Sequence, residues 1–362
     1  MFPIHQKHTP TDACVNWAQD CLGPKLTISA MAEHAHQNKY HFSVICQKTK
    51  QRFLLVETHN DISSSLKFAT TTKILRKNGI HTPQVHHQKF STEACWMIVD
   101  HFGDETMLDW LNQRPTERQQ RIVIHHCLRE IQKFQKQKIE YPIPTYNTEK
   151  IRNDMQRCET DYLQNLLEAS LSPREKAHLA HAKTYISEQI EKIPSAPMHF
   201  DFHSANIMML PEKTLGILDF QDIQIGPINY DLASLLTDHY YHHPHLKISH
   251  TIQKFYDEFV SKEHQSQISA QLFTEMTQLI AIQRHLKNIG IFSKLYLQGK
   301  KHYLNHIPGM MHRLKQLCLQ NEILAKLPDI IWSSSLAANL DEKLIENQKQ
   351  STNESAIETS VH

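Results

Sequence analysis

The chain has 362 residues, and its 39 lysines and arginines are balanced by 38 aspartates and glutamates, giving a net charge of +1. This balance excludes the strongly basic surface typical of proteins that bind nucleic acids or anionic membranes. Hydrophobic residues make up 40% and only 8 residues are glycine, so we expect a globular core and no glycine-rich architecture. No apolar run approaches the ~20 residues that span a bilayer.

The cysteines and histidines exclude some further classes. The 7 cysteines are odd in number and include no Cys-x-x-Cys, so we expect buried free thiols in a reducing cytoplasm. The N-terminus also lacks the basic-then-apolar layout of a signal peptide. Histidine occurs 27 times, with a dense patch at 242–245 that could hold a metal. Pro244 interrupts the helical spacing that places two ligands on one face, which favours an incidental tract.

The first hundred residues predict a small lobe that mixes strands and one helix. Residues 42–46, 53–57 and 96–99 are β-prone runs separated by polar turns. Residues 64–79 place apolar side chains at three- and four-residue steps and end at Asn-Gly, as a capped helix does.

After residue 106 the pattern becomes mainly helical. Helices are predicted at 117–138, 150–170 and 173–192, a compact β region at 196–222, and further helices to about 328. Residues 333–362 are polar with little apolar patterning, so we expect a tail without regular structure there.

A predicted β-hairpin carries the most informative side chains. Two short apolar runs, 207–210 and 215–218, flank a Pro-Glu-Lys-Thr turn. This hairpin would bring Asn206, at the start of one strand, beside Asp219, at the end of the other. Asp201 lies just ahead on the same loop, so three oxygen-bearing side chains would converge at one end of the hairpin.

Phosphoryl transfer requires such a set of side chains. One carboxylate orients the attacking hydroxyl and accepts its proton, while an amide oxygen and a second carboxylate hold Mg²⁺ on the nucleotide phosphates. The spacing His-x-Asp-x₄-Asn, followed by Asp-Phe at the end of a strand, matches the catalytic and metal-binding loops of kinases. A plain polar β-turn is the alternative, and the downstream Asp-Phe favours the catalytic interpretation.

These motifs resemble the aminoglycoside phosphotransferase/choline kinase superfamily, and most closely its branch of bacterial anomeric N-acetylmuramate/N-acetylglucosamine kinases. The matching segments are His-Phe-Asp-Phe-His-Ser-Ala-Asn at 199–206, Leu-Asp-Phe-Gln-Asp at 218–222, and residues 225–236 and 283–292, with a weaker match at 75–83. The resemblance implies an α+β, bilobal, protein-kinase-like fold. Its N-lobe would span 1–103, with a hinge at 100–103, and its mainly helical C-lobe 104–332.

The resemblance also implies roles for individual residues. Asp201 would be the catalytic base, and Asn206 and Asp219 would be the Mg²⁺ ligands. His199 and Asp231 would support the catalytic loop.

Four further polar residues point toward the acceptor. His203, Gln221 and Asp222 would bind substrate or support neighbouring side chains. Arg284 lies in an apolar helical pattern, where it would either grip a substrate carboxylate or form a structural salt bridge.

The nucleotide side departs from the pattern of protein kinases, which have a glycine-rich loop and a lysine on the third strand. The candidate loop at 32–42 has no glycine, and Glu57 falls near the place of the lysine. We expect Lys39 to supply the missing charge, the alternative being a solvated lysine at a strand edge. The adenine would lie against the hinge backbone at Asp100 and Phe102.

The expected reaction transfers the γ-phosphoryl group of ATP, with Mg²⁺, to a small hydroxylated acceptor. By resemblance, the acceptor is the anomeric hydroxyl of N-acetylmuramate or N-acetylglucosamine, in salvage of cell-wall sugars. One alternative is an aminoglycoside- or choline-type kinase, but the C-terminal half has no dense acidic cluster for a cationic acceptor. The other is an inactive nucleotide-binding protein, against which the intact Asp201, Asn206 and Asp219 argue. We expect no nucleic-acid or membrane partner.

Overall fold

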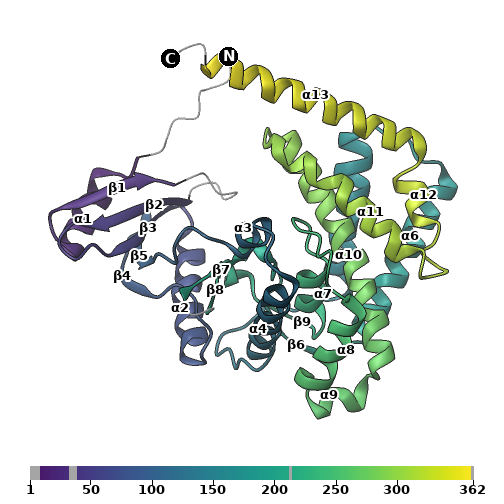
Figure 1. Ribbon diagram of the computed structural model, residues 1–362, viewed down its shortest axis with the longest axis horizontal. Helices are drawn as coiled ribbons and strands as arrows, with labels where there is room; N and C mark the ends of the chain where they lie inside the picture. The colour runs from purple at the N-terminus through teal and green to yellow at the C-terminus, as the bar shows by residue number, and fades with distance from the viewer. Residues whose placement is uncertain (1–8, 32–38, 212–213, 360–362) are drawn as a thin grey trace. The chain divides into compact units, whose positions relative to one another are not determined.

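The computed structural model describes residues 9–31, 39–211 and 214–359, and most of their helices and strands are labelled in Figure 1. The chain divides into two compact units. The first comprises Met1–Ile143 and Ala205–Ile223, and the second comprises Pro144–Ser204 and Gln224–His362.

The first unit is built on an antiparallel five-stranded sheet in the order β1-β2-β3-β5-β4. Its strands are β1 (Leu26–Ala30), β2 (Lys39–Cys46), β3 (Arg52–His59), β4 (Val85–Phe90) and β5 (Ala94–Asp100). Side chains alternate between the two faces, so Leu55 on β3 joins one apolar cluster and Val56 joins another.

A helix lies on each face of this sheet. Helix α1 (Asp12–Leu22) buries Cys14 and Ala18 against one face, and α2 (Ile62–Lys77) packs Phe68 against the other. The sequence pattern predicted α2 but not α1, because a short helix with two fully buried side chains leaves little periodicity.

The predicted hairpin is present and belongs to this first unit. Its strands β7 (Ile207–Met209) and β8 (Leu215–Ile217) pair antiparallel. Helix α3 (Met107–Asn112) packs on β7, while α4 (Glu117–Gln135) anchors to the unit by a hydrogen bond of 2.9 Å from the Lys133 ammonium to the Gly79 carbonyl. The compact unit therefore extends beyond the predicted lobe boundary at 103, and the hinge stays a prediction.

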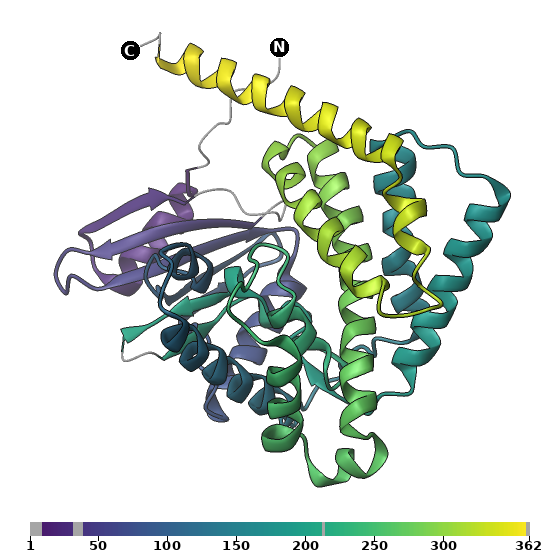
Figure 2. The same ribbon diagram turned by 45° about the vertical axis from the view of Figure 1, so that its right-hand side comes forward.

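The second unit is a bundle of helices around α10 (Ala270–Leu297), which Figure 2 shows turned by 45° from the view of Figure 1. The other helices are α5 (Thr148–Arg157), the π-helix η1 (Cys158–Leu166), α6 (Pro173–Glu191), α7 (Tyr230–Leu236), α8 (Ile248–Phe259), α9 (Lys262–Gln267), η5 (Lys301–His306), α11 (Ile307–Cys318), α12 (Leu327–Ile331) and α13 (Ser334–Thr359). Strands β6 (Ser195–Met198) and β9 (Gln224–Pro227) form a separate antiparallel pair. Helix α10 is buried over most of its length because α5, η1, α6, α7, α8 and α11 pack around it.

The C-terminal segment differs from the expected irregular tail, because Ser334–Thr359 form α13. Leu336, Leu340 and Asn347 are buried, and the Asn347 amide donates to the Lys301 carbonyl at 3.2 Å. These inward-facing positions recur at three- to four-residue steps, but polar neighbours outnumber them and obscure the pattern.

The seven cysteines are free, and all except Cys21 are buried. Within the described ranges no helix is long and apolar enough to cross a membrane. The same residues contain no group of His, Cys, Asp and Glu side chains arranged to hold a metal ion by themselves.

Candidate active site

The loop that follows β6 in the second unit adopts an uncommon backbone conformation. Phe200 has φ +80°, in the left-handed region that costs energy for a residue with a bulky side chain. Asp231, on α7, accepts hydrogen bonds from the N–H groups of His199 at 2.7 Å and Phe200 at 2.9 Å. The predicted supporting aspartate thus holds two consecutive backbone groups of this loop.

Arg284, on α10, holds the same loop from the other side of its backbone. Its side chain is 2% exposed, and Nη1 donates to the Phe200 carbonyl at 2.9 Å. Nη2 lies 3.9 Å from Oδ1 of Asp201, and the guanidinium lies over the Tyr230 ring. These contacts are those of a structural salt bridge, one of the two roles expected for Arg284, and a substrate contact stays a prediction.

Asp201 keeps part of its side chain accessible, with 35% exposed. Its N–H donates to Nδ1 of His199 at 3.3 Å. Burial favours the protonated acid, but Lys287, Arg284 and the nearby histidines together outweigh this effect and lower the pKa of Asp201. The carboxylate is therefore ionised at neutral pH, as a general base must be.

Lys287 is a residue that the sequence pattern did not single out. It lies one turn beyond Arg284 on α10, with its side chain 6% exposed. Its Nζ is 3.6 Å from the centre of the Phe200 ring and 3.9 Å from Oδ2 of Asp154. The sequence signal that could have identified Lys287 is a lysine three residues after an arginine in a mostly apolar helix.

His203 begins a cluster of aromatic and imidazole rings next to this loop. Its ring centre is 4.7 Å from that of His239 and 5.4 Å from that of Tyr240. Burial lowers the pKa of both His203 and His239, so both imidazoles are neutral at pH 7. Both carboxylate oxygens of Asp238 accept backbone hydrogen bonds of 2.8 Å, one from Ser204 and the other from Tyr240.

In the first unit, the hairpin positions the two predicted metal ligands. Ile207 pairs with Ile217, and the Leu218 N–H donates to the Asn206 carbonyl at 2.9 Å. Asn206 and Asp219 therefore flank the paired strands at the same end. Asp201 belongs to the second unit, so its convergence with these two residues stays a prediction.

The Asp219 carboxylate is held by Gln221, which had been expected on the acceptor side. Asp219 has φ +56°, and its Oδ1 accepts a hydrogen bond of 2.5 Å from Nε2 of Gln221, which is 8% exposed. The adjacent Phe220 ring stacks on Phe68 of α2 at 4.9 Å. The carboxylate of Asp219 and the amide oxygen of Asn206 are the ligand types that Mg²⁺ prefers, so this donor set fits the ion.

Lys39 and Glu57 lie on opposite faces of the sheet. Lys39 pairs with Thr58 across β2 and β3, and its Nζ lies 5.5 Å from the centre of the Phe68 ring. Burial lowers the pKa of Lys39, and Asp219 is the strongest of the groups that oppose this shift. Glu57 instead accepts hydrogen bonds from Thr11 and from the Trp96 indole on the face covered by α1.

The side chains at the expected hinge have local structural partners. Asp100 accepts hydrogen bonds from the Gln84 N–H at 2.9 Å and pairs with Nε2 of His86 at 2.6 Å. A Cβ on Gly216 would lie 2.6 Å from the Phe102 ring, so this glycine permits close packing against the hinge. A nucleotide contact at these residues would therefore fall to the backbone, and this contact stays a prediction.

Residues 41–260 of this chain match the phosphotransferase enzyme family. The chain belongs to this family. It is accordingly an enzyme, a small-molecule kinase with a hydroxyl group as acceptor.

Curated relatives share the name N-acetylmuramate/N-acetylglucosamine kinase. The protein from Pseudomonas putida is 22% identical over 80% of this chain and 81% of its own length. The protein from Pseudomonas aeruginosa is 25% identical over 74% of this chain and 77% of its own length. The protein from Neisseria meningitidis serogroup B is 24% identical over 68% of this chain and 74% of its own length.

Solved structures share the fold at low sequence identity. The gentamicin complex of APH(2")-IIa aligns with a TM-score of 0.56 and 12% identity, covering 88% of this chain and 99% of that one. A ternary complex of aminoglycoside phosphotransferase APH(4)-Ia with ADP and hygromycin B aligns with a TM-score of 0.55 and 12% identity. This alignment covers 85% of this chain and 98% of that one. The predicted α+β, bilobal, kinase-like fold is confirmed.

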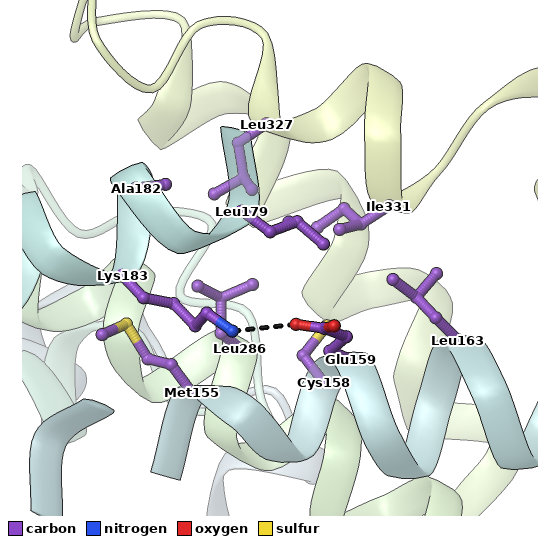
Figure 3. A pocket seen from close by; sticks show the side chains of 10 residues that line it. All are labelled: Met155, Cys158, Glu159, Leu163, Leu179, Ala182, Lys183, Leu286, Leu327 and Ile331. Atoms are coloured by element: carbon purple, nitrogen blue, oxygen red, sulfur yellow. Dashed lines mark hydrogen bonds and ion pairs between the residues drawn. The ribbon is translucent and has the colours of Figure 1, made fainter. Parts of the chain in front are cut away.

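A small cavity lies elsewhere in the second unit of the phosphotransferase. Figure 3 shows Lys183 and Glu159 facing each other across it, with Nζ and Oε2 2.8 Å apart, and apolar side chains such as Leu286 around them. Its volume of about 10 Å³ is room for one water molecule and far too small for a sugar or nucleotide.

Proposed function

We propose that this phosphotransferase transfers the γ-phosphoryl group of ATP to the anomeric hydroxyl of N-acetylmuramate and N-acetylglucosamine. The names of three relatives, each aligned over at least 68% of this chain, support this acceptor class. The reaction would serve the salvage of cell-wall sugars. The seven free thiols support a reducing compartment, and we place the enzyme in the cytoplasm.

The choice of acceptor rests on the charges around the catalytic loop. Arg284 and Lys287 are buried cations close to Asp201, while the carboxylates of Asp231 and Asp238 are buried and bound to backbone N–H groups. A cationic aminoglycoside or choline needs an acidic surface to replace its hydration. A neutral or anionic sugar has no such requirement, so this environment favours the amino sugars.

The proposed chemistry assigns one task to each group. Asp201 accepts the proton of the attacking hydroxyl, while Asn206 and Asp219 hold Mg²⁺. When bound, the ion neutralises charge on the transferred phosphoryl group. Lys39 binds the nucleotide phosphates, and the backbone at Asp100 and Phe102 binds the adenine.

The remaining residues support these groups or contact the acceptor. His199, Asp231 and Arg284 hold the loop that carries Asp201, and Gln221 orients Asp219. We assign acceptor contacts to His203 and Asp222. The barrier is lowered mainly by positioning and charge stabilisation.

A panel of acceptors tests this proposal. ADP release would be followed with N-acetylmuramate, N-acetylglucosamine, kanamycin and choline, with ATP and Mg²⁺ fixed. We expect kcat/KM for both amino sugars to exceed that for the two cationic acceptors by at least about 100-fold, the range that unpaired buried polar groups can impose. A preference for kanamycin or choline would reject the sugar assignment, and ATP binding without turnover on any acceptor would indicate an inactive enzyme.

A further inference from the structure

We propose that Lys287 and Arg284 form a cationic clamp on the stacked rings of Phe200 and Tyr230 and thereby position Asp201. The two cations lie one turn apart on α10, a helix that touches the catalytic loop but supplies none of the reacting groups. This inference rests on the proposed role of Asp201 as catalytic base.

The geometry of the clamp is a stack with a cation at each ring. The Phe200 and Tyr230 rings lie 5.3 Å apart with an interplanar angle of 11°. The Lys287 Nζ is 3.6 Å from the centre of the Phe200 ring, and the Arg284 guanidinium carbon is 4.9 Å from the centre of the Tyr230 ring. Both distances allow cation–π attraction, which is strongest at desolvated sites such as this one. Tyr146 closes the stack with edge-on contacts to both rings.

The backbone of Phe200 explains why such a clamp is needed. A left-handed conformation at a bulky residue persists only when surrounding contacts over-determine it. Asp231 fixes the Phe200 N–H, Arg284 fixes its carbonyl, and the clamp fixes its ring. Because Asp201 is the next residue, the direction of its carboxylate follows from the conformation of Phe200.

The burial of Lys287 indicates that its positive charge has a functional role. Its Nζ has no hydrogen-bond acceptor among the described residues, and the Asp154 oxygen at 3.9 Å already accepts a bond of 2.8 Å from the Tyr146 hydroxyl. A buried cation with so few partners is unfavourable, and an apolar residue of similar size would be tolerated at least as well. The ammonium is also shielded from solvent, so it contacts the Phe200 ring rather than a ligand.

The test replaces Lys287 by methionine, which keeps the length of the side chain and removes its charge. Lys294→Met is the matched control, because Lys294 lies on the same helix and is exposed. For Lys287→Met we expect kcat to fall by about 10- to 100-fold with both KM values within about twofold, since misplaced catalytic groups cost this much. Hydrogen exchange at the backbone amides of 199–203 should become faster. Lys287→Arg should restore kcat to within about threefold, and Lys294→Met should match the unsubstituted enzyme.

Three kinetic results would overturn the clamp. The first is an unchanged kcat in Lys287→Met, and the second is a kcat in Lys287→Arg as low as in Lys287→Met. The third is a raised KM for anionic N-acetylmuramate alone, which would make Lys287 a substrate-binding residue. The hydrogen-exchange measurement needs no substrate, so unchanged exchange at 199–203 rejects the clamp even if the sugar assignment itself fails.

Discussion

Lys39 lies on β2 and pairs with Thr58 on β3. In protein kinases the phosphate-binding lysine lies on the third strand, so Lys39 is on the strand next to that position. Lys39 is half-buried, and Asp219, the predicted metal ligand, is the strongest of the charges that oppose the lowering of its pKa by burial. Lys39→Ala is therefore expected to raise the KM for ATP by about 10-fold, the value of one charge-assisted contact to a phosphate. The KM for the acceptor should stay constant, and Lys48→Ala, at an exposed lysine, should change neither value. Steady-state kinetics measure both KM values. An unchanged KM for ATP in Lys39→Ala would show that Lys39 does not bind the nucleotide.

Single residues differ in how well their roles could be predicted from sequence. The motif spacing placed Asp219 and Asn206 at one end of a hairpin, because strand pairing is a local property. The same reasoning did not predict the contact of Lys287 with the Phe200 ring or the hydrogen bond of Gln221 to Asp219. Their contacts depend on which element packs behind each loop, and a one-dimensional pattern does not contain that information.

The contact between α10 and the end of α5 depends on one glycine. A Cβ at Gly290 would lie 2.4 Å from the backbone carbon of Arg157, where α5 continues into the π-helix η1. Gly290→Ala is expected to destabilise the protein by about 3 kcal/mol, because neither backbone can move away easily. The melting temperature should then fall by about 4 °C.

Gly309 on α11 provides the matched control for this substitution. Apart from the backbone of its own helix turn, no atom of the described residues lies within 4 Å of its Cβ position, so Gly309→Ala should raise the stability by up to about 1 kcal/mol through helix propensity. Thermal unfolding followed by circular dichroism measures both variants. Equal melting temperatures for Gly290→Ala and Gly309→Ala would mean that α10 and α5 are not closely packed.

Whole elements could be predicted where an apolar periodicity extended over many residues or where the sequence contained typical turn residues. Helix α4 and the β7–β8 hairpin followed directly from such signals. Helices α1 and α13 did not, because each buries few side chains, and the π-helix η1 has no distinct sequence signal. These elements are stabilised by tertiary packing, which outweighs weak local preference.

Across the whole molecule, buried histidines predict how stability depends on pH. Burial lowers the pKa of four of them in the second unit: His203, His239, His243 and His285. In the unfolded chain these groups bind protons below about pH 6.5, whereas in the folded chain they do so only at lower pH. The unfolded state therefore takes up more protons as the pH falls through 6.5, and the folded state loses stability.

The expected loss is largest for the two histidines with the most strongly lowered pKa, His239 and His285. Each should contribute up to about 1.4 kcal/mol of destabilisation between pH 7.5 and 5.5. His285→Gln should flatten this dependence, while His87→Gln, at an exposed histidine, should leave it unchanged. Urea unfolding at several pH values measures the slope. Stability that is constant or rises between pH 7.5 and 5.5 would contradict the burial of neutral imidazoles.

The central claim is that Asp201 directs phosphoryl transfer to the anomeric hydroxyl of an N-acetylated amino sugar, and ³¹P NMR tests it most directly. The enzyme would be incubated with ATP, Mg²⁺ and N-acetylglucosamine or N-acetylmuramate, beside Asp201→Asn and beside the 1-O-methyl glycoside of N-acetylglucosamine. We predict a sugar 1-phosphate signal with both free sugars, none with the methyl glycoside, and formation at least about 100-fold slower in Asp201→Asn. A phosphorylated methyl glycoside, undiminished turnover in Asp201→Asn, or no sugar phosphate from the unsubstituted enzyme would contradict the account.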